Sequence, residues 1–142
     1  MKTVSVIIAT FNAGKVFEEY LKSIRGQNYD KSEIEVLVAD GGSTDGTVEL
    51  AKRYDCKVVN EKTGSPEGAK AVALKKAKGK LVLIGDSDNI WPNEHWLKRM
   101  VEGISCDPGA LGTYSWRYTF RKKDNLMNRY FALFGANDPV VW

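Results

Sequence analysis

Four short apolar runs are the feature that most constrains how this 142-residue chain can fold. They are rich in valine, isoleucine and leucine, and in three of them apolar residues stand at successive positions instead of alternating with polar ones. Runs of this kind predict strands that are buried on both faces, as in a parallel sheet. The four predicted strands are VSVIIA (4–9), IEVLVA (34–39), KVVN (57–60) and LVLIG (81–85).

Helical patterns fill the intervals between these runs. The predicted helices cover 16–24, 48–54 after a start at 43–45, 69–77, and 96–104 after Pro92 and Asn93. Strands that alternate with helices predict an α/β fold, with a doubly wound, mostly parallel sheet and helices on both faces. After Pro108 the sequence changes, and it predicts an aromatic strand over 110–120 and an amphipathic helix over 125–134.

Composition narrows the classes of protein that fit. A net charge of +3 is too small to indicate a nucleic-acid partner. Cys56 and Cys106 stand far apart with no metal-binding spacing, which predicts reduced thiols. There is no signal-peptide pattern, and no apolar stretch approaches the roughly 20 residues that span a bilayer. We therefore expect a cytoplasmic protein, and the inner face of the membrane is one place where it could act.

Polar residues follow three of the predicted strands. In a doubly wound sheet, ligands bind beyond the carboxyl ends of the strands. The segments there are Thr10-Phe11-Asn12, Asp40-Gly41-Gly42-Ser43-Thr44-Asp45 and Asp86-Ser87-Asp88. Because parallel strands end at the same edge, we expect these segments to form one site.

Asp86 and Asp88 admit two interpretations. Two carboxylates separated by one residue suit a hard cation such as Mg²⁺ or Mn²⁺, with a substrate diphosphate supplying further oxygens. Asp-Ser-Asp-Asn is also good turn chemistry, so an ordinary turn explains the same residues. An EF-hand is excluded, because Trp91 stands where that loop needs glycine and Leu97 where it needs glutamate.

Other candidate residues also have a second explanation. Asp40 precedes two glycines and could accept from a base or a ribose, whereas Asp45 suits a helix N-terminus. Gly68 and Lys70 stand at a helix start, where a diphosphate could bind, but a solvated lysine is equally compatible. There is no GxGxxG sequence, and His95 has no partner cluster.

Taken in order, these motifs resemble those of family 2 glycosyltransferases with the GT-A fold, a Rossmann-like nucleotide-diphospho-sugar transferase fold. The similarity covers about residues 3–104. It rests on VSVIIATFN, on VADGGSTDGT, on the segment from Gly68 through Ala77-Lys78-Gly79 to Asp86-Ser87-Asp88, and on Trp91-Pro92 followed by Leu97.

The resemblance implies a UDP- or GDP-sugar donor, a Mn²⁺ or Mg²⁺ cofactor and a DxD motif. It implies that the sugar is transferred with inversion to a hydroxyl of the acceptor, which is a glycan or a lipid phosphate. A carboxylate base would deprotonate that hydroxyl. The implied donor-binding residues are Thr10, Phe11 (against the base), Asn12, Asp40 (at the base or ribose), Gly68 and Lys70 (near the diphosphate), Asp86 and Ser87. Asp88 would ligate the metal, with Asp86 as a second ligand.

The chain also departs from the family pattern. Gly41 replaces the second aspartate of a pair, and Ala71 stands where asparagine is common. The family's catalytic base comes from a later acidic motif, for which Asp138 is the only late candidate here, and it also suits a turn before Pro139. We therefore expect one truncated GT-A-like domain over 1–142, with a donor-binding half (1–104) and the start of an acceptor half (105–142).

Four further interpretations stay open. The chain could be a nucleotide-diphosphate-binding fragment without turnover, or a phosphotransferase with Asp86 as nucleophile and Asp88 as acid. The C-terminal basic residues suit either a membrane surface or a solvated face. Apolar residues near the end suit self-association into a homo-oligomer. These basic and apolar residues are Arg117, Arg121, Lys122, Lys123, Arg129, Phe131, Phe134 and 140–142.

Overall fold

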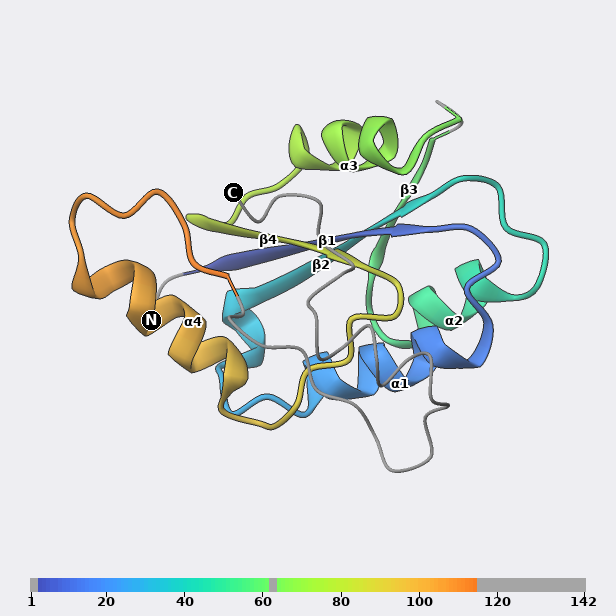
Figure 1. Ribbon diagram of the computed structural model, residues 1–142. Helices are drawn as coiled ribbons and strands as arrows, with labels where there is room; N and C mark the ends of the chain where they lie inside the picture. The colour runs from blue at the N-terminus through green and yellow to red at the C-terminus, as the bar shows by residue number, and fades with distance from the viewer. Residues whose placement is uncertain (1–2, 62–63, 115–142) are drawn as a thin grey trace, which may run out of the picture. The chain divides into compact units, whose positions relative to one another are not determined.

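The computed structural model describes residues 3–61 and 64–114 (Figure 1). Contacts divide the chain into two compact units, Met1–Glu102 and Gly103–Trp142. The strands are β1 (Val4–Thr10), β2 (Ile34–Asp40), β3 (Lys57–Asn60) and β4 (Leu81–Asp86). The helices are α1 (Gly14–Arg25), α2 (Thr47–Arg53), α3 (Pro66–Leu74) and α4 (Trp96–Cys106), with a 3-10 turn, η1 (Lys31–Glu33). Each predicted strand and helix between residues 4 and 104 is present.

The four strands form one parallel sheet in the order β3-β2-β1-β4. Val4 of β1 pairs with Ile34 of β2 and with Leu81 of β4, so the three strands start together. They also end together, with Thr10 beside Asp40 and Ala9 beside Asp86. The predicted α/β fold with a parallel sheet is confirmed.

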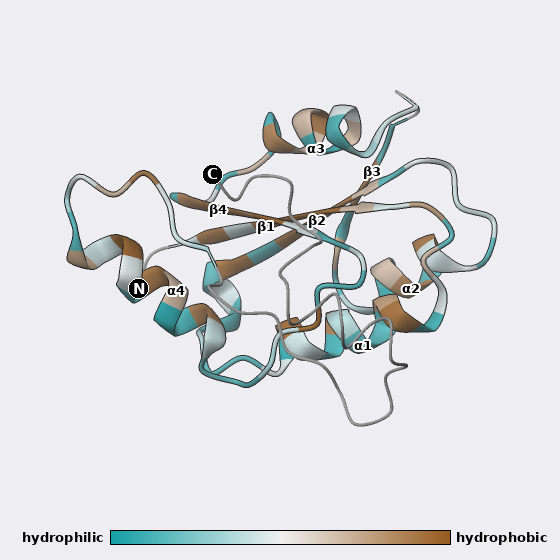
Figure 2. Ribbon diagram, viewed as in Figure 1, coloured by the Kyte–Doolittle hydropathy of each residue, from teal (hydrophilic) through white to brown (hydrophobic). Residues whose placement is uncertain are grey.

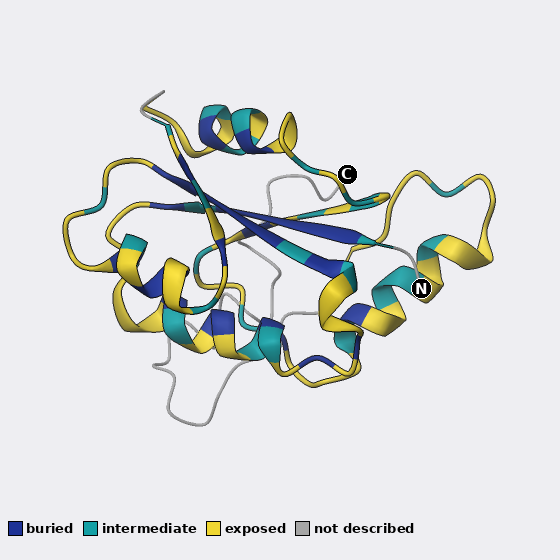
Figure 3. Ribbon diagram, turned by 180° about the vertical axis from the view of Figure 1, so that it is seen from behind, coloured by how far each residue is buried: buried dark blue, intermediate teal, exposed yellow. Residues whose placement is uncertain are grey.

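Helices cover both faces of the sheet. On one face, β1 packs against the apolar stripe of α1 and against residues of α2 and the start of α4. On the other face, Ile7 and Leu37 pack against Ala69 and Ala73 of α3. Figure 1 shows that α3 lies on the opposite side of the sheet from α1 and α2, and Figures 2 and 3 show that the two central strands are both apolar and buried. The α1 stripe consists of Phe17, Tyr20, Leu21 and Ile24, at the spacing of one helical face.

The prediction that three strands are buried on both faces is wrong for β4. Val82 and Ile84 of this strand are 42% and 58% exposed. The register puts them on the same face as Ser5 and Ile7, the face that α3 covers. Because α3 packs over β1 and β2, the edge strand β4 lies outside its cover.

Smaller differences also have local causes. Val16, expected on the buried stripe of α1, is 41% exposed, because it lies one position before that stripe begins at Phe17. Helix α3 ends at Leu74 and not at 77, because the chain turns there towards Gly79 and β4. Residues 110–114, the described part of the predicted strand 110–120, do not form a strand. The predicted helix 125–134 lies outside the described residues.

Two other expectations from composition can be compared with the fold. Cys56 is buried and Cys106 is exposed, and both are free thiols, as predicted. Among residues 3–61 and 64–114, no helix has both the length and the apolar character needed to cross a membrane.

Candidate functional site

The carboxyl ends of β1, β2 and β4 meet at one edge of the sheet (Figure 1). Thr10, Asp40 and Asp86 are the last residues of these three strands. The parallel register places Thr10 directly beside Asp40, and Asp86 beside Ala9 on the other side of β1. The three polar segments that follow the strands therefore lie along one edge, as the sequence predicts.

Asp40 is buried and fully hydrogen-bonded. Its Oδ1 accepts from the hydroxyls of Thr10 (3.0 Å) and Ser43 (2.5 Å), and its Oδ2 accepts from the backbone N–H groups of Gly42 (2.9 Å) and Ser43 (2.8 Å). Burial raises the pKa of Asp40, but these hydrogen bonds outweigh it and leave the pKa below its usual value. Four bonds fill the acceptor capacity of a carboxylate. Asp40 therefore holds the loop after β2, and a base or ribose would have to displace one of these donors.

Phe11 and Asn12 have different surroundings. The Phe11 side chain is 66% exposed, and its ring edge lies 3.5 Å from where a Cβ on Gly41 would stand. Asn12 has a φ of 49° and is bonded to the loop after β2, since its Oδ1 accepts from Thr44 N–H and its own N–H donates to the Ser43 hydroxyl. Phe11 therefore offers an open aromatic face, whereas Asn12 fastens two loops together.

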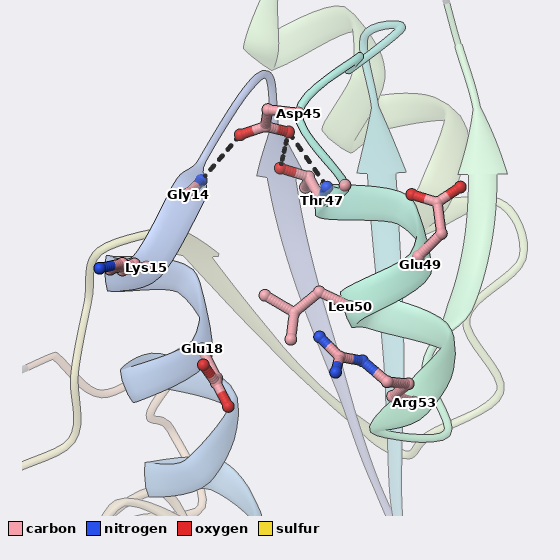
Figure 4. Close-up of a pocket in the computed structure, with 9 residues that line it drawn as sticks. Gly14, Lys15, Glu18, Asp45, Thr47, Glu49, Leu50 and Arg53 are labelled. Atoms are coloured by element: carbon pink, nitrogen blue, oxygen red, sulfur yellow. Dashed lines mark hydrogen bonds between the residues drawn. The ribbon is translucent and has the colours of Figure 1, made fainter.

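Asp45 lies at the N-termini of two helices (Figure 4). Its Oδ2 accepts from the N–H of Gly14 in α1 (3.1 Å), and its Oδ1 accepts from the N–H and hydroxyl of Thr47 in α2 (3.0 and 2.5 Å). The Thr47 hydroxyl also accepts from the N–H of Ala13. These bonds, chiefly the one from the Thr47 hydroxyl, lower the pKa of Asp45. The prediction of a helix-terminal carboxylate is confirmed, and Asp45 serves two helices.

A surface hollow of about 330 Å³ lies between α1 and α2, beside this network (Figure 4). It contains none of the predicted donor-binding or metal-binding residues. The hollow therefore lies beside the strand-end site and shares with it only Asp45, the last residue of the segment after β2. Its lining consists of Gly14, Lys15, Glu18, Asp45, Gly46, Thr47, Glu49, Leu50 and Arg53.

Helix α3 brings a lysine to the end of β4. The Ser65 hydroxyl caps this helix by accepting from the N–H of Gly68 (3.0 Å), so that N–H is occupied. Lys70 lies in α3, and its Nζ is 2.6 Å from Asp86 Oδ1. The Lys70 side chain is 18% exposed and that of Asp86 is 61% exposed. The ammonium group thus lies at the site edge, next to one carboxylate of the Asp86–Asp88 pair.

Residues 86–90 form a tight turn. Asp86 N–H donates to Asn89 Oδ1 (3.0 Å), Asn89 N–H donates to Asp86 O, and Ile90 N–H donates to Asp88 O. Asn89 also donates from its side chain to Asp88 Oδ1 (3.3 Å). The turn leaves Asp86 and Asp88 exposed and Ser87 half-buried. The turn interpretation is therefore confirmed. Because both carboxylates remain accessible, the turn is compatible with a bound cation, and the cation interpretation stays a prediction.

Helix α1 anchors the segment that follows this turn. Trp91 is buried, stacks on Trp96 at 4.8 Å and meets Tyr20 edge-on at 6.0 Å. The backbone N–H of Trp91 donates to the Ser23 hydroxyl. The side chain of Gln27 donates from Nε2 to Asn93 O and accepts at Oε1 from the N–H of Leu97. The sequence did not point to Ser23 and Gln27, because nothing in the local pattern distinguishes them from other polar helix residues. The apolar stripe places Tyr20 in the core, but it does not reveal what its hydroxyl meets.

Two predictions about reactive groups have different outcomes. The side chain of His95 is half-exposed and lies 3.4 Å from that of its neighbour Glu94, as expected for a surface residue. Asp138, the candidate base, lies outside the described residues. Within the described part of the chain, no group of three or more histidine, cysteine, aspartate or glutamate side chains could hold a metal ion.

Comparison with known proteins identifies a family. The family model described as glycosyl transferase family 2 matches residues 5–138. The chain is 38% identical over 104 residues to the poly(ribitol-phosphate) beta-N-acetylglucosaminyltransferase TarS of Staphylococcus aureus, covering 69% of this chain and 18% of that protein. It is 34% identical over 134 residues to the glycosyltransferase AglE of Haloferax volcanii, covering 89% of this chain and 43% of that protein.

Solved structures agree with this match. S. aureus TarS 1–349 in complex with UDP-GlcNAc has a TM-score of 0.68 and 32% identity, covering 83% of this chain and 38% of that one. The mannosyltransferase PcManGT of Pyrobaculum calidifontis, in complex with GDP-Man and Mn²⁺, has a TM-score of 0.65 and 33% identity. The match covers 75% of this chain and 33% of that one. The chain spans less than half the length of the curated relatives named here.

Proposed function

This chain belongs to glycosyl transferase family 2 and has the GT-A fold, and from that premise we propose that it is the donor-binding part of an inverting, metal-assisted glycosyltransferase. The family supports glycosyl transfer from a nucleotide sugar in general. The proposal adds a UDP- or GDP-sugar as donor, a divalent cation and a hydroxyl acceptor. Complexes of its structural relatives with UDP-GlcNAc and with GDP-Man support this choice of donor.

The ion pair between Lys70 and Asp86 is the observation that carries the proposal. It places a cationic side chain against a carboxylate at the edge where Phe11 is exposed. A nucleoside diphosphate has an aromatic base, which suits the Phe11 face, and an anionic diphosphate, which suits the Lys70 ammonium. One ligand can therefore use both ends of this edge.

A divalent cation fits the donor set at this edge. Asp86 and Asp88 are exposed carboxylates in one turn, and oxygen ligands suit Mg²⁺ and Mn²⁺. An ion held by these two carboxylates would take its remaining ligands from substrate phosphates and water. We assign Asp88 as the main ligand and Asp86 as the second. When bound, such an ion neutralises charge on the leaving diphosphate.

The residues of the chain divide the remaining work. Phe11 stacks against the base, Lys70 holds the diphosphate, and Asp40 keeps the loop after β2 in place beneath them. The acceptor oxygen attacks the anomeric carbon opposite the diphosphate, so that one C–O bond forms as another breaks and the configuration inverts. The acceptor proton passes to a carboxylate base, for which Asp138 remains the candidate.

A thermal-shift experiment tests the proposal. UDP or GDP together with Mn²⁺ should raise the melting temperature of the wild-type chain by mass action. Asp88→Ala should abolish this shift, whereas Glu102→Ala, which alters an exposed carboxylate on α4, should retain it. Absence of a shift with every nucleotide tried would refute the proposal.

A second function is nucleotide binding without turnover, which the contacts proposed for Phe11 and Lys70 would support by themselves. The chain covers 18% of TarS and 43% of AglE. Transfer assays on this chain and on a longer version distinguish the two functions. Activity in the longer version alone supports the fragment, and activity in both supports the enzyme. No described contact favours the phosphotransferase.

The acceptor side of the reaction extends the proposal. We propose a glycan or lipid-phosphate acceptor and a cytoplasmic location, with a membrane surface as the place of contact when the acceptor is a lipid. Co-sedimentation with vesicles that contain anionic lipid tests the membrane contact, and neutral vesicles are the control.

A further inference from the structure

The hydroxyl of Tyr20 is buried at the base of the Asp86–Asp88 turn. Tyr20 lies in α1 and its side chain is 0% exposed. Its hydroxyl oxygen lies 2.7 Å from the position that a Cβ on Gly85 would occupy. Gly85 is the residue before Asp86, so the phenol reaches the backbone from which the turn starts.

The described residues offer no acceptor to the hydrogen of this hydroxyl, and the Trp91 indole, which lowers its pKa, makes no hydrogen bond of normal geometry with it. A buried hydroxyl that has no partner destabilises a fold relative to one that is hydrogen-bonded. The aromatic ring itself is well used, because it meets Trp91 edge-on at 6.0 Å and 71°. Phenylalanine would make the same ring contacts without burying a polar group. Core packing in this state therefore explains the ring of Tyr20 and leaves its hydroxyl unexplained.

The surroundings of the hydroxyl connect it to the turn. Asn89 Oδ1 lies 3.6 Å from the same point beside Gly85. That oxygen accepts from Asp86 N–H, and the side-chain nitrogen of Asn89 donates to Asp88. Burial raises the pKa of Tyr20 well above its usual value, the Trp91 indole offsets part of this, and the charges of Asp86 and Asp88 raise it further. The hydroxyl thus keeps its proton and remains a donor.

Asn89 is bonded to both aspartates, so a ligand that draws the two carboxylates towards itself also moves Asn89. We propose that Tyr20 is a positioning residue of the donor site, whose hydroxyl donates to Asn89 Oδ1 when the turn binds a cation and a diphosphate. This inference rests on the proposed function. It gives the unpaired hydroxyl a partner in the liganded state, at the expense of stability in the ligand-free one.

Tyr20→Phe tests the inference through two separate measurements on the 142-residue chain. The melting temperature without ligand should stay the same or rise, because an unpaired buried hydroxyl is removed. The Kd for UDP in saturating Mn²⁺, measured by calorimetry, should rise about fivefold, as expected for one lost hydrogen bond. If the chain prefers GDP, the same titration is made with GDP.

Tyr54→Phe is the matched control. The Tyr54 hydroxyl donates to Glu18 Oε1 at 3.2 Å, between α1 and the end of α2, away from the turn. Removing it should lower the melting temperature slightly and leave the Kd unchanged. The control and Tyr20→Phe are thus expected to show opposite patterns in the two measurements.

Gly85→Ala adds a second test that depends on the same contact. Its new methyl group would stand 2.7 Å from the Tyr20 hydroxyl oxygen but 3.6 Å from the ring carbon that carries it. Gly85→Ala should therefore lower the melting temperature by several degrees, and combining it with Tyr20→Phe should restore most of that loss. The double variant should keep the weakened binding, because its hydroxyl is absent.

The outcomes separate this inference from the proposed function. If Tyr20→Phe binds UDP as tightly as the wild type, the hydroxyl has no positioning role and the inference is overturned. A lower melting temperature with unchanged binding would show that a buried water already satisfies the hydroxyl, which overturns it too. If the wild type binds neither UDP nor GDP with Mn²⁺, the proposed function fails, and this inference fails with it.

Discussion

The Nζ atom of Lys70 lies 2.6 Å from Oδ1 of Asp86, which joins α3 to the end of the edge strand β4. The Asp86 side chain is 61% exposed, and exposed ion pairs contribute little to stability. The pair matters for position, because it puts a cation where the sequence places two carboxylates. It also reduces the repulsion between the nearby carboxylates of Asp86 and Asp88, since Lys70 offsets the charge of one of them.

Lys70→Met should change the binding of metal and of nucleotide in opposite directions. Loss of the ammonium removes a competitor for Asp86, so Mn²⁺ alone should bind several-fold more tightly. It also removes a partner of the diphosphate, so UDP with Mn²⁺ should bind roughly tenfold more weakly. Calorimetric titrations with and without nucleotide measure both effects. Lys75→Met, at an exposed position just after α3, should change neither, and equal binding by Lys70→Met would exclude a role at the site.

Phe11→Ala should weaken nucleotide binding without affecting the fold. Stacking of a base on an aromatic ring contributes about 1–3 kcal/mol, so the Kd for UDP should rise by roughly 5- to 100-fold. Because Phe11 is 66% exposed, the free energy of unfolding should change by less than about 0.5 kcal/mol. Leu111→Ala, which also removes an exposed apolar side chain, is the control for general surface effects. Unchanged UDP binding by Phe11→Ala would place the base elsewhere.

Asp45→Ala should lower the melting temperature by a few degrees. The substitution removes the acceptor for Gly14 N–H in α1 and for Thr47 N–H in α2, so both helices lose a cap at once. Asp45→Asn keeps one side-chain oxygen and should lose less. Thermal unfolding followed by circular dichroism measures the series, and equal melting temperatures for all three proteins would contradict the double cap.

Glu35→Gln should flatten the dependence of stability on pH in the acid range. Burial raises the pKa of Glu35, but bonds from the Ser5 hydroxyl, Lys78 N–H and Lys57 outweigh it and lower the pKa from 4.5 to about 2. A lowered carboxyl pKa stabilises the fold above about pH 4.5, and this contribution is lost as the pH falls towards 2. Urea unfolding at several pH values from about 6 down to about 2 should show this loss of stability in the wild type and much less of it in Glu35→Gln. Glu102→Gln should retain the wild-type slope.

Gly79→Ala should destabilise the chain strongly. A Cβ at this position would lie 2.4 Å from Ser5 N and 2.8 Å from Val4 C, which are backbone atoms of β1 that cannot move aside. We expect a loss of about 1–3 kcal/mol in the free energy of unfolding, the usual cost of overpacking. Gly112→Ala, where nothing lies within 4 Å of the new Cβ, should be neutral. Chemical denaturation of both variants makes the comparison.

Much of the fold could be read from local patterns. Successive apolar residues in β1 and β2 predict strands buried on both faces, because only a central parallel strand hides both sides from water. The 3.6-residue stripe of α1 predicts its buried face for the same reason. The parallel arrangement then brings Thr10, Asp40 and Asp86 to one edge without further information, since parallel strands point the same way.

Which atoms meet at that edge could not be read in this way. The apolar character of Val82 and Ile84 suggested a buried strand, yet β4 is exposed on one face because α3 packs over β1 and β2. Asp40 and Lys70 were both candidates for ligand contact, but Asp40 is saturated by its own loop, whereas Lys70 reaches Asp86. Periodicity shows which face of an element is buried, while these contacts depend on the packing of one element against another.

Tyr20 and Gly85 show the same limit most clearly. The sequence marks Tyr20 as a core residue and Gly85 as the approach to a turn, and both assignments hold. That the hydroxyl of one occupies the space left by the missing side chain of the other follows only from the way α1 lies under β4. Local patterns encode burial, because burial depends on each residue's own affinity for water. A contact between residues 65 positions apart depends on the closing of the whole core, to which every packed side chain contributes.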